Sequence, residues 1–343
     1  MVYLASPMML LLTIHLLPSV MSDIKLFRLT NGRAVEFQGE ASDLEKPLQN
    51  LIETNLEALL GIRFLSTEYS TGKTHGGRID TLGLDENNCP VILEYKRSVG
   101  ENVINQGLFY LDWLMDHKAE FMLLAQQKLG QGAAQDIDWT APRLVCIAAD
   151  FTKYDGHAVR QIDRNIELIR YRRFGDELLL LELVNASTDS STKAGANKGL
   201  KSSKEGKESA PEKVMGPDKP YAETVASLSP ALTDVLASLE DYTLSLGDDV
   251  QRKELRLYAA FKRLKNFATL VPQKGRLLLY LHLDPAKVMK VLPSAKDVSQ
   301  KGHWGTGDVE VPLATMADLE LVKPFIAEAY EGRSQASRSS HVE

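Results

Sequence analysis

Apolar residues recur at three- and four-residue steps early in the chain. This spacing predicts an amphipathic helix that ends at Gly61, with its apolar face formed by Leu44, Leu48, Leu51, Ile52, Leu56, Leu59 and Leu60. Two stretches of strand character follow at Arg78–Leu84 and Pro90–Arg97, joined by the polar turn at 85–88. Helices are then predicted over 102–115 and 118–129, and strands over Leu144–Ala149 and Glu177–Val184. This order predicts an α/β sandwich around a mixed central sheet.

A second region of regular hydrophobic pattern begins near Tyr221. Its pattern predicts a small α+β domain with helices at 231–246 and 316–330 and strands at 255–261, 276–283 and 309–313. Residues 186–220 lie between the two regions and hold almost no large apolar side chains, so they are predicted to be a flexible linker. The predicted organisation is a first domain over 21–185, the linker, a second domain over 221–332 and a disordered tail over 333–343.

The first 20 residues are apolar but do not fit a membrane segment well. No lysine or arginine precedes Lys25, and Pro7 and Pro18 interrupt the apolar run. Because Met21 opens an ordinary soluble sequence, an over-extended start is favoured over an export signal, which stays open as the alternative. The rest of the chain contains no apolar run long enough for a span, so no membrane partner and a cytoplasmic location are expected.

Charge and cysteine content narrow the function classes. The net charge of −6 over 343 residues gives no overall basic signal, so a nucleic acid would have to be held by local patches. Cys89 and Cys146 form no CxxC or Cys/His pattern, which argues against zinc and disulfides and for unpaired thiols in a reducing compartment.

Two carboxylates and a lysine are predicted to converge on the first hairpin. Asp80 lies on its first strand, while Glu94 and Lys96 are two residues apart on the second and so share one face with Ile92. Val91, Leu93 and Tyr95 take the other face. Carboxylates suit a hard cation such as Mg²⁺ or Mn²⁺, which can activate water for phosphodiester hydrolysis. The alternative is a solvated strand face with cross-strand ion pairs.

The context of these residues resembles the PD-(D/E)xK nuclease superfamily, in its branch of NucS-type and RecB-like endonucleases. The resemblance covers about residues 43–184 and rests on a preceding helix, the stretch Gly77-Arg78-Ile79-Asp80, Glu94-x-Lys96, and Gln106 with Tyr110 in a QxxxY element. It implies a restriction-endonuclease-like sandwich and a Mg²⁺- or Mn²⁺-dependent DNA endonuclease in repair, restriction or phage defence. Ile79 stands where the family name has proline.

The resemblance also implies roles for individual residues. Asp80 and Glu94 would be metal ligands and Lys96 catalytic. A helical acid near the metal would be Glu45 rather than Glu53, although Glu45 could instead form a capping box with Ser42. Gln106 and Tyr110 would orient the site or touch DNA, or else form a helix face packed on the sheet. His75, in a loop, is interpreted as incidental.

The second domain contains a basic stretch. Residues 252–276 hold eight basic residues and one acid, a local charge of +7, with Tyr258, Phe261 and Phe267 interleaved. Such a pattern is typical of phosphate contact and base stacking, so DNA contacts are predicted at Arg256, Lys262, Arg263 and Lys265, together with Arg78 of the first domain. The alternative is core aromatics with solvated charges.

The second domain resembles an uncharacterised domain appended to nuclease-like domains. The loop at 301–307 lacks phosphate-loop spacing, so nucleotide binding is rejected. The leading function is a DNA endonuclease, the alternative is a non-catalytic nucleic-acid-binding module with the same fold, and a homodimer is left open.

Overall fold

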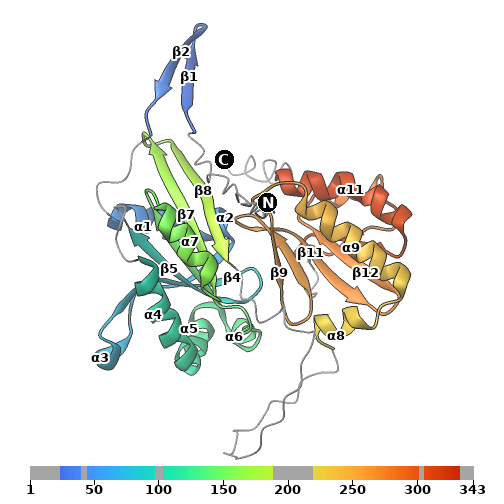
Figure 1. Ribbon diagram of the computed structural model, residues 1–343, viewed down its shortest axis with the longest axis horizontal. Coiled ribbons are helices and arrows are strands. Elements are labelled where there is room, and N and C mark those ends of the chain that lie inside the picture. The colour runs from blue at the N-terminus through green and yellow to red at the C-terminus, as the bar shows by residue number, and fades with distance from the viewer. Residues whose placement is uncertain (1–23, 40–44, 97–102, 188–218, 301–304, 333–343) are drawn as a thin grey trace, which may run out of the picture.

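A computed structural model of the 343-residue chain describes residues 24–39, 45–96, 103–187, 219–300 and 305–332. The segment at 1–20, the residue Ser42, the tail at 333–343 and most of the expected linker lie outside the described residues. Figure 1 shows two α/β bodies side by side, one built from the N-terminal half and one from the C-terminal part.

The N-terminal domain is built on a six-stranded mixed sheet. Its strand order is β3-β4-β5-β6-β7-β8. Neighbours pair antiparallel except for the parallel pairs β5–β6 and β6–β7. The strands are β3 (Ile62–Ser70), β4 (Arg78–Asp85), β5 (Pro90–Lys96), β6 (Arg143–Ala148), β7 (Asn165–Phe174) and β8 (Leu178–Ser187). The predicted mixed α/β sandwich is confirmed by this sheet and the helices that cover it.

Helices cover both faces of this sheet. They are α1 (Glu45–Thr54), α2 (Leu56–Leu60), α3 (Gly72–His75), α4 (Val103–Asp116), α5 (Lys118–Leu129), α6 (Gln131–Gln135) and α7 (Lys153–Gln161). Ile92 packs into the core beneath α4 and α5, whereas Val91, Leu93 and Tyr95 pack into the core beneath α1 and α2. The predicted alternation along the second strand is therefore confirmed.

The first predicted helix is interrupted. The structure divides it at Asn55 into α1 and α2, and Gly61 ends α2 in the left-handed conformation at φ 64°. A left-handed residue stops a helix and glycine adopts it without strain, so the predicted stop at Gly61 is confirmed.

A hairpin that the hydrophobic pattern did not predict projects from the N-terminal domain. It consists of β1 (Leu26–Thr30) and β2 (Arg33–Phe37), and both views show it extending away from the rest of the chain. Its base contacts the rest of the domain through the Phe37 ring, 6.0 Å from the Phe174 ring, and Arg28 lies 4.0 Å from Glu177 in an exposed ion pair. Its apolar side chains, such as Leu29, stay exposed, which explains why no buried pattern marks it.

The C-terminal domain has its own six-stranded sheet, antiparallel throughout, with order β13-β14-β12-β11-β10-β9. Its strands are β9 (Gln251–Glu254), β10 (Ala259–Lys262), β11 (Asn266–Gln273), β12 (Arg276–Leu281), β13 (Lys296–Asp297) and β14 (Val309–Leu313). Its helices are α8 (Tyr221–Ala226), α9 (Pro230–Leu244), α10 (Pro285–Met289) and α11 (Met316–Glu331). The expected small α+β domain is confirmed, but the strand predicted over 255–261 is wrong in its first half: residues 255–258 form the turn between β9 and β10, and only 259–261 lie in a strand.

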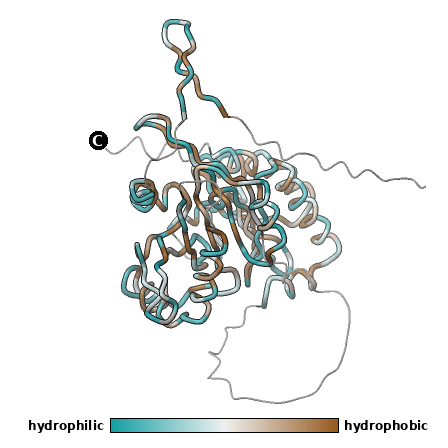
Figure 2. Tube along the Cα trace, turned by 60° about the vertical axis from the view of Figure 1, so that its left-hand side comes forward, coloured by the Kyte–Doolittle hydropathy of each residue, from teal (hydrophilic) through white to brown (hydrophobic). Residues whose placement is uncertain are grey.

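The two faces of the second sheet have different partners. One face packs against α9 and α11 through a large apolar core. The other carries Tyr258, Leu278 and Tyr280, and it shares a smaller core with Cys89 and Ala141 of the N-terminal domain. Figure 2 shows apolar segments along the strands of both bodies, with polar segments on the outer helices. The domains are therefore joined by a packed interface.

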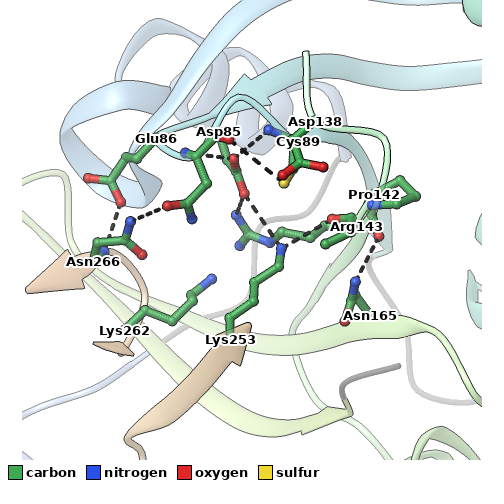
Figure 3. Close-up of polar contacts among 12 residues, drawn as sticks. Asp85, Glu86, Cys89, Asp138, Pro142, Arg143, Asn165, Lys253, Lys262 and Asn266 are labelled. Carbon is green, nitrogen blue, oxygen red and sulfur yellow. Dashed lines mark hydrogen bonds and ion pairs between the residues drawn. The ribbon is translucent and has the colours of Figure 1, made fainter. Parts of the chain in front are cut away.

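Polar contacts add to this interface at the turn between β4 and β5 (Figure 3). Lys253 donates to the carbonyl oxygen of Ala141 (3.1 Å) and lies 3.9 Å from Oδ2 of Asp85. The N–H of Asn266 donates to Oε2 of Glu86 at 2.8 Å. The C-terminal domain therefore contacts the turn of the β4–β5 hairpin. The same hairpin carries Asp80 and Glu94 at the end opposite this turn.

No helix in the described part of the chain combines the length and apolar character that a membrane span requires.

Candidate active site

The predicted carboxylates meet where β4 and β5 part. The two strands are paired from Leu84 with Pro90 to Thr81 with Leu93. Beyond that point Oδ2 of Asp80 accepts a hydrogen bond from the N–H of Tyr95 (3.0 Å), and Oε1 of Glu94 accepts one from the N–H of Asp80 (3.2 Å). Side-chain oxygens thus take the place of the backbone ladder, and each carboxylate is fixed by the opposite strand.

The electrostatics of this pair are unfavourable without a cation. The Glu94 side chain is fully buried (0% exposed), and its Oε2 has no hydrogen-bond partner among the described residues. Burial, followed by the nearby charge of Asp80, raises the pKa of Glu94 to about 9. Burial also raises the pKa of Asp80, against the opposing effects of the Tyr95 hydrogen bond and the Lys96 charge. A positive ion bound beside the pair would offset the free-energy cost of ionising each carboxylate.

A divalent cation fits this arrangement. Mg²⁺ is commonly held by one or two protein carboxylates with waters completing its shell, and the unpartnered Oε2 of Glu94 is an oxygen of the required kind. Among the described residues, no group of three or more His, Cys, Asp or Glu side chains is arranged to hold a metal. The donor set that the structure brings together is therefore the pair Asp80 and Glu94.

Lys96 lies at the end of β5, next to the carboxylates. Its side chain is 16% exposed, and its Nζ is 4.0 Å from Oε2 of Glu45 on α1. Its charge lowers the pKa of both Asp80 and Glu94. The expected third ligand, Glu45, is thus found beside the lysine rather than within a three-carboxylate cluster, and its role as a ligand stays a prediction.

Gln49, a buried amide that the sequence pattern did not single out, holds the backbone of Asp80 in place. Gln49 of α1 is 4% exposed, and its Nε2 donates to the carbonyl oxygen of Asp80 (2.8 Å) and to Oε1 of Glu53 (3.0 Å). Glu53 also accepts a hydrogen bond from the Thr81 hydroxyl (2.6 Å). Glu53 therefore helps fix α1 to β4, and its four-residue spacing from Gln49 was the sequence signal that could have marked this pair.

The QxxxY element fixes the start of β4. Tyr110 is buried, its hydroxyl accepts a hydrogen bond from the N–H of Arg78 (3.1 Å), and Nε2 of Gln106 lies 3.4 Å from the same hydroxyl. A Cβ at Gly77 would come within 2.5 Å of the Tyr110 ring, so the ring requires glycine at that position. The geometry places Gln106 and Tyr110 as supports of the strand that carries Asp80.

An open cavity of about 700 Å³ adjoins this site. It is lined by Glu68, Ser70, Gly72, Lys73, Gly76, Gly77, Arg78, Asp80, Gln106 and Tyr110. Arg78 is exposed, with 67% of its side chain accessible, and its contact with DNA stays a prediction. His75 instead lies against the Phe109 and His117 rings, 5.7 and 5.5 Å away.

The basic stretch of the C-terminal domain is not the surface that was expected. Lys262 is 3% exposed and donates to Oε1 of Glu167 at 2.8 Å, so it lies inside the domain interface. This corrects its assignment as a DNA contact, because a buried, ion-paired lysine is not accessible to a phosphate. The three interleaved aromatics are also buried, which corrects their expected role in base stacking: Tyr258, Phe261 and Phe267.

The remaining predicted contacts of that stretch are more accessible. Arg263 is 45% exposed, although it pairs with Asp249 and lies 4.8 Å from the Tyr330 ring centroid. Arg256 and Lys265 are partly exposed. DNA contact by these three residues stays a prediction. Cys89 and Cys146 are buried, unpaired thiols, as predicted.

Comparisons with known proteins add similarity but no established activity. Residues 222–332 match a domain of unknown function (DUF5655). An uncharacterized protein of Haemophilus influenzae is 28% identical over 310 residues, covering 89% of this chain and 99% of that protein.

Two solved structures are similar to part of the chain. A repair endonuclease from Pyrococcus abyssi is 18% identical, with a TM-score of 0.25 over 40% of this chain and 50% of that chain. An EndoMS–dsDNA complex is also 18% identical, with a TM-score of 0.22 over 38% of this chain and 47% of that chain. The chain thus spans about half the length of the solved structures it matches. Because both TM-scores are below 0.5, we base the function on the geometry of the site.

Proposed function

We propose that this protein is a metal-dependent DNA endonuclease that hydrolyses phosphodiester bonds in DNA repair, restriction or phage defence. The observation that supports this most is the pairing of the partly buried Asp80 with the buried Glu94, one oxygen of which has no partner among the described residues. A bound Mg²⁺ or Mn²⁺ would neutralise charge on the scissile phosphate and lower the pKa of the attacking water.

The chain's own residues have distinct roles in this proposal. Asp80 and Glu94 hold the ion, and their cross-strand hydrogen bonds keep both carboxylates in place before DNA arrives. Lys96 places a positive charge beside them, where it stabilises negative charge that develops on the phosphate. Glu45 is proposed as a further ligand from α1, and Gln106 and Tyr110 hold the start of β4.

The pair is better explained by catalysis than by stability. A buried carboxylate with a pKa near 9 costs free energy whenever it is ionised, and Oε2 of Glu94 has no hydrogen-bond partner among the described residues. Replacing Glu94 with glutamine keeps the shape and removes this cost. Glu94→Gln should therefore leave the fold as stable as the wild type, or more stable, while it removes a metal ligand.

The test is a cleavage assay with the purified full-length chain. End-labelled single-stranded, duplex, forked and mismatched DNA are incubated with Mg²⁺, Mn²⁺ or EDTA. We expect cleavage of at least one substrate with a metal and none in EDTA. Lys96→Ala should lose most turnover but retain metal binding, measured by Mn²⁺ titration, because lysine is not a ligand. Equal cutting in EDTA would contradict metal dependence. DNA binding without cutting under any condition would favour the non-catalytic binding module.

A further inference from the structure

Glu68 occupies an unusual position next to the carboxylate pair. Its neighbours Thr67 and Tyr69 pair with Thr81 and Ile79 of β4, so Glu68 stands opposite Asp80 in the register. Its backbone has φ 50°, a left-handed conformation that residues other than glycine rarely adopt. Such strained positions persist only where surrounding contacts hold them, and they gather at functional sites.

Both oxygens of the Glu68 carboxylate are engaged by cations. Oε1 accepts a hydrogen bond from Nζ of Lys46 (2.8 Å), and Oε2 lies 3.4 Å from Nη1 of Arg78. The three residues come from three elements, with Lys46 on α1, Glu68 on β3 and Arg78 on β4. Because a cation contacts each oxygen, we interpret Glu68 as an acid that holds Lys46 and Arg78 and not as a further metal ligand.

Stability does not explain this arrangement. Lys46 and Arg78 are 51% and 67% exposed, and ion pairs at such exposure contribute little to folding. Like charges directly opposite each other on a sheet are unfavourable, and Glu68 stands opposite Asp80. The strained backbone adds a further cost. The three side chains together therefore point to a ligand.

The position of the cations indicates the class of that ligand. Glu68, Arg78 and Asp80 line the same open cavity, in which a substrate would reach the carboxylates. Lys46 does not line this cavity itself, but its Nζ contacts Glu68, which does. An arginine fork with a nearby ammonium group suits an anion that carries several acceptor oxygens, such as a phosphodiester. In the free protein the Glu68 carboxylate occupies the place of such an anion.

We propose that Lys46 and Arg78 bind a phosphate of the nucleic-acid backbone next to the one that is cleaved, and that Glu68 holds both cations until this phosphate displaces it. The identity of the ligand as DNA rests on the proposed nuclease function. The contribution of Glu68 is to hold the ends of two long, exposed side chains at its own carboxylate, beside the cavity that it lines. It is a positioning residue, because it acts through Lys46 and Arg78.

The test measures binding separately from cleavage. A fluorescein-labelled forked DNA, which has single-stranded and duplex parts, is titrated with the full-length chain in EDTA at several salt concentrations. Each lost phosphate contact should reduce the slope of log K against log salt by about 0.7 to 0.9. We expect this reduction in Lys46→Ala and in Arg78→Ala, and about twice the reduction in the double variant. Lys290→Ala, which removes an exposed lysine of the C-terminal domain, serves as the control and should leave the slope unchanged.

Glu68→Gln tests the displacement itself. Glutamine has the same shape and the same backbone requirement but no charge to compete with a phosphate. We expect severalfold tighter DNA binding with an unchanged salt slope. In Mg²⁺ we expect both KM and kcat to fall, because the cations bind DNA more readily but are no longer held in position. A purely structural role would lower the melting temperature without this split.

The outcomes separate this inference from the nuclease proposal. Unchanged slopes in Lys46→Ala and Arg78→Ala, in a wild type that cuts DNA, would overturn the phosphate site and leave the nuclease standing. Reduced slopes in a protein that cuts no DNA would support the phosphate site and overturn the nuclease. Weaker binding by Glu68→Gln would overturn the displacement, and a wild type that binds no DNA would overturn both proposals.

Discussion

Replacing Glu167 with glutamine should weaken the whole chain, because this carboxylate connects the two domains. It lies on β7, and Arg143 of β6 donates to its Oε1 at 3.0 Å and to its Oε2 at 2.8 Å. Lys262 of the C-terminal domain also donates to Oε1, at 2.8 Å. Arg143 additionally donates to Oδ2 of Asp85 at 2.9 Å, which extends the network to the turn of the β4–β5 hairpin.

The loss in free energy of unfolding caused by Glu167→Gln can be estimated in two ways, which agree. Burial alone would raise the pKa of Glu167, but the charges of Arg143 and Lys262 outweigh it and lower the pKa from 4.5 to about 2. That difference corresponds to about 3 kcal/mol of stabilisation at neutral pH. Removing one partner from a buried ion pair costs about 3 to 5 kcal/mol in general. Because glutamine can still hydrogen-bond to Arg143, we expect the lower value.

The pH dependence follows from the direction of the shift. A carboxylate whose pKa is lowered on folding stabilises the protein fully above its unfolded pKa, and this contribution is lost as the pH falls towards the folded value. The difference between wild type and Glu167→Gln should therefore be largest above about pH 4.5 and should shrink as the pH falls towards 2.

Urea unfolding followed by circular dichroism measures this difference. Glu223→Gln is the control, since Glu223 forms an exposed pair with Lys219 at 3.6 Å and should change stability by less than about 0.5 kcal/mol. A loss below about 1 kcal/mol for Glu167→Gln at pH 7, or an equal loss at pH 7 and pH 3, would refute the idea that the buried network joins the domains.

Three further experiments test the domain interface and the support of β4. Trypsin should cut within 188–218, and the two products should still elute together in gel filtration, because buried contacts join the domains; separate elution would contradict this. Burial is the main cause that raises the pKa of Glu86 to about 7, so the stability of the wild type should decrease as the pH rises from about 4.5 to 7. Glu86→Gln should abolish this part of the pH dependence in urea titrations. A variant with the same pH profile as the wild type would contradict the prediction. Tyr110→Phe removes the acceptor for the N–H of Arg78, so it should lower the free energy of unfolding by about 1 kcal/mol in urea and slow DNA cleavage. If both quantities were unchanged, Tyr110 would not be a positioning residue.

The β4–β5 hairpin could be predicted from sequence because its geometry is local. A four-residue turn and the two-residue period of a strand suffice to bring Asp80 beside Glu94. The faces of β5 follow from the same period, and the structure confirms them. The stop at Gly61 is local as well, since it depends on one residue that tolerates the left-handed conformation.

Elements whose polar residues have distant partners could not be predicted in this way. The strand β7 contains Glu167 and Arg170, which look like surface positions in a linear pattern yet are buried. Glu167 is neutralised by Arg143, 24 residues away, and by Lys262, 95 residues away. The same long-range pairing explains why the prediction for Lys262 was wrong. A run of basic residues in the sequence does not show that an acid of the other domain, here Glu167, pairs with one of them and buries it.

Support residues behind the site were missed for a related reason. Gln49 lies on the inner face of α1, where an apolar residue would be expected, and its role emerges only once β4 is placed beneath it. Glu68 carried no sequence signal, since its left-handed backbone and its two cationic partners depend on how three elements pack.

The most direct test of the central claim is a comparison of DNA cleavage by the wild type and by Glu94→Gln in Mg²⁺, with circular dichroism confirming that both are folded. Loss of a ligand should remove about 4 kcal/mol of transition-state stabilisation, which corresponds to a rate about a thousandfold lower. We predict that the wild type cuts at least one DNA structure and that Glu94→Gln does so about a thousandfold more slowly at unchanged or higher stability. Equal cleavage rates for the two proteins would contradict the assignment of Asp80 and Glu94 as the metal-binding pair of a nuclease.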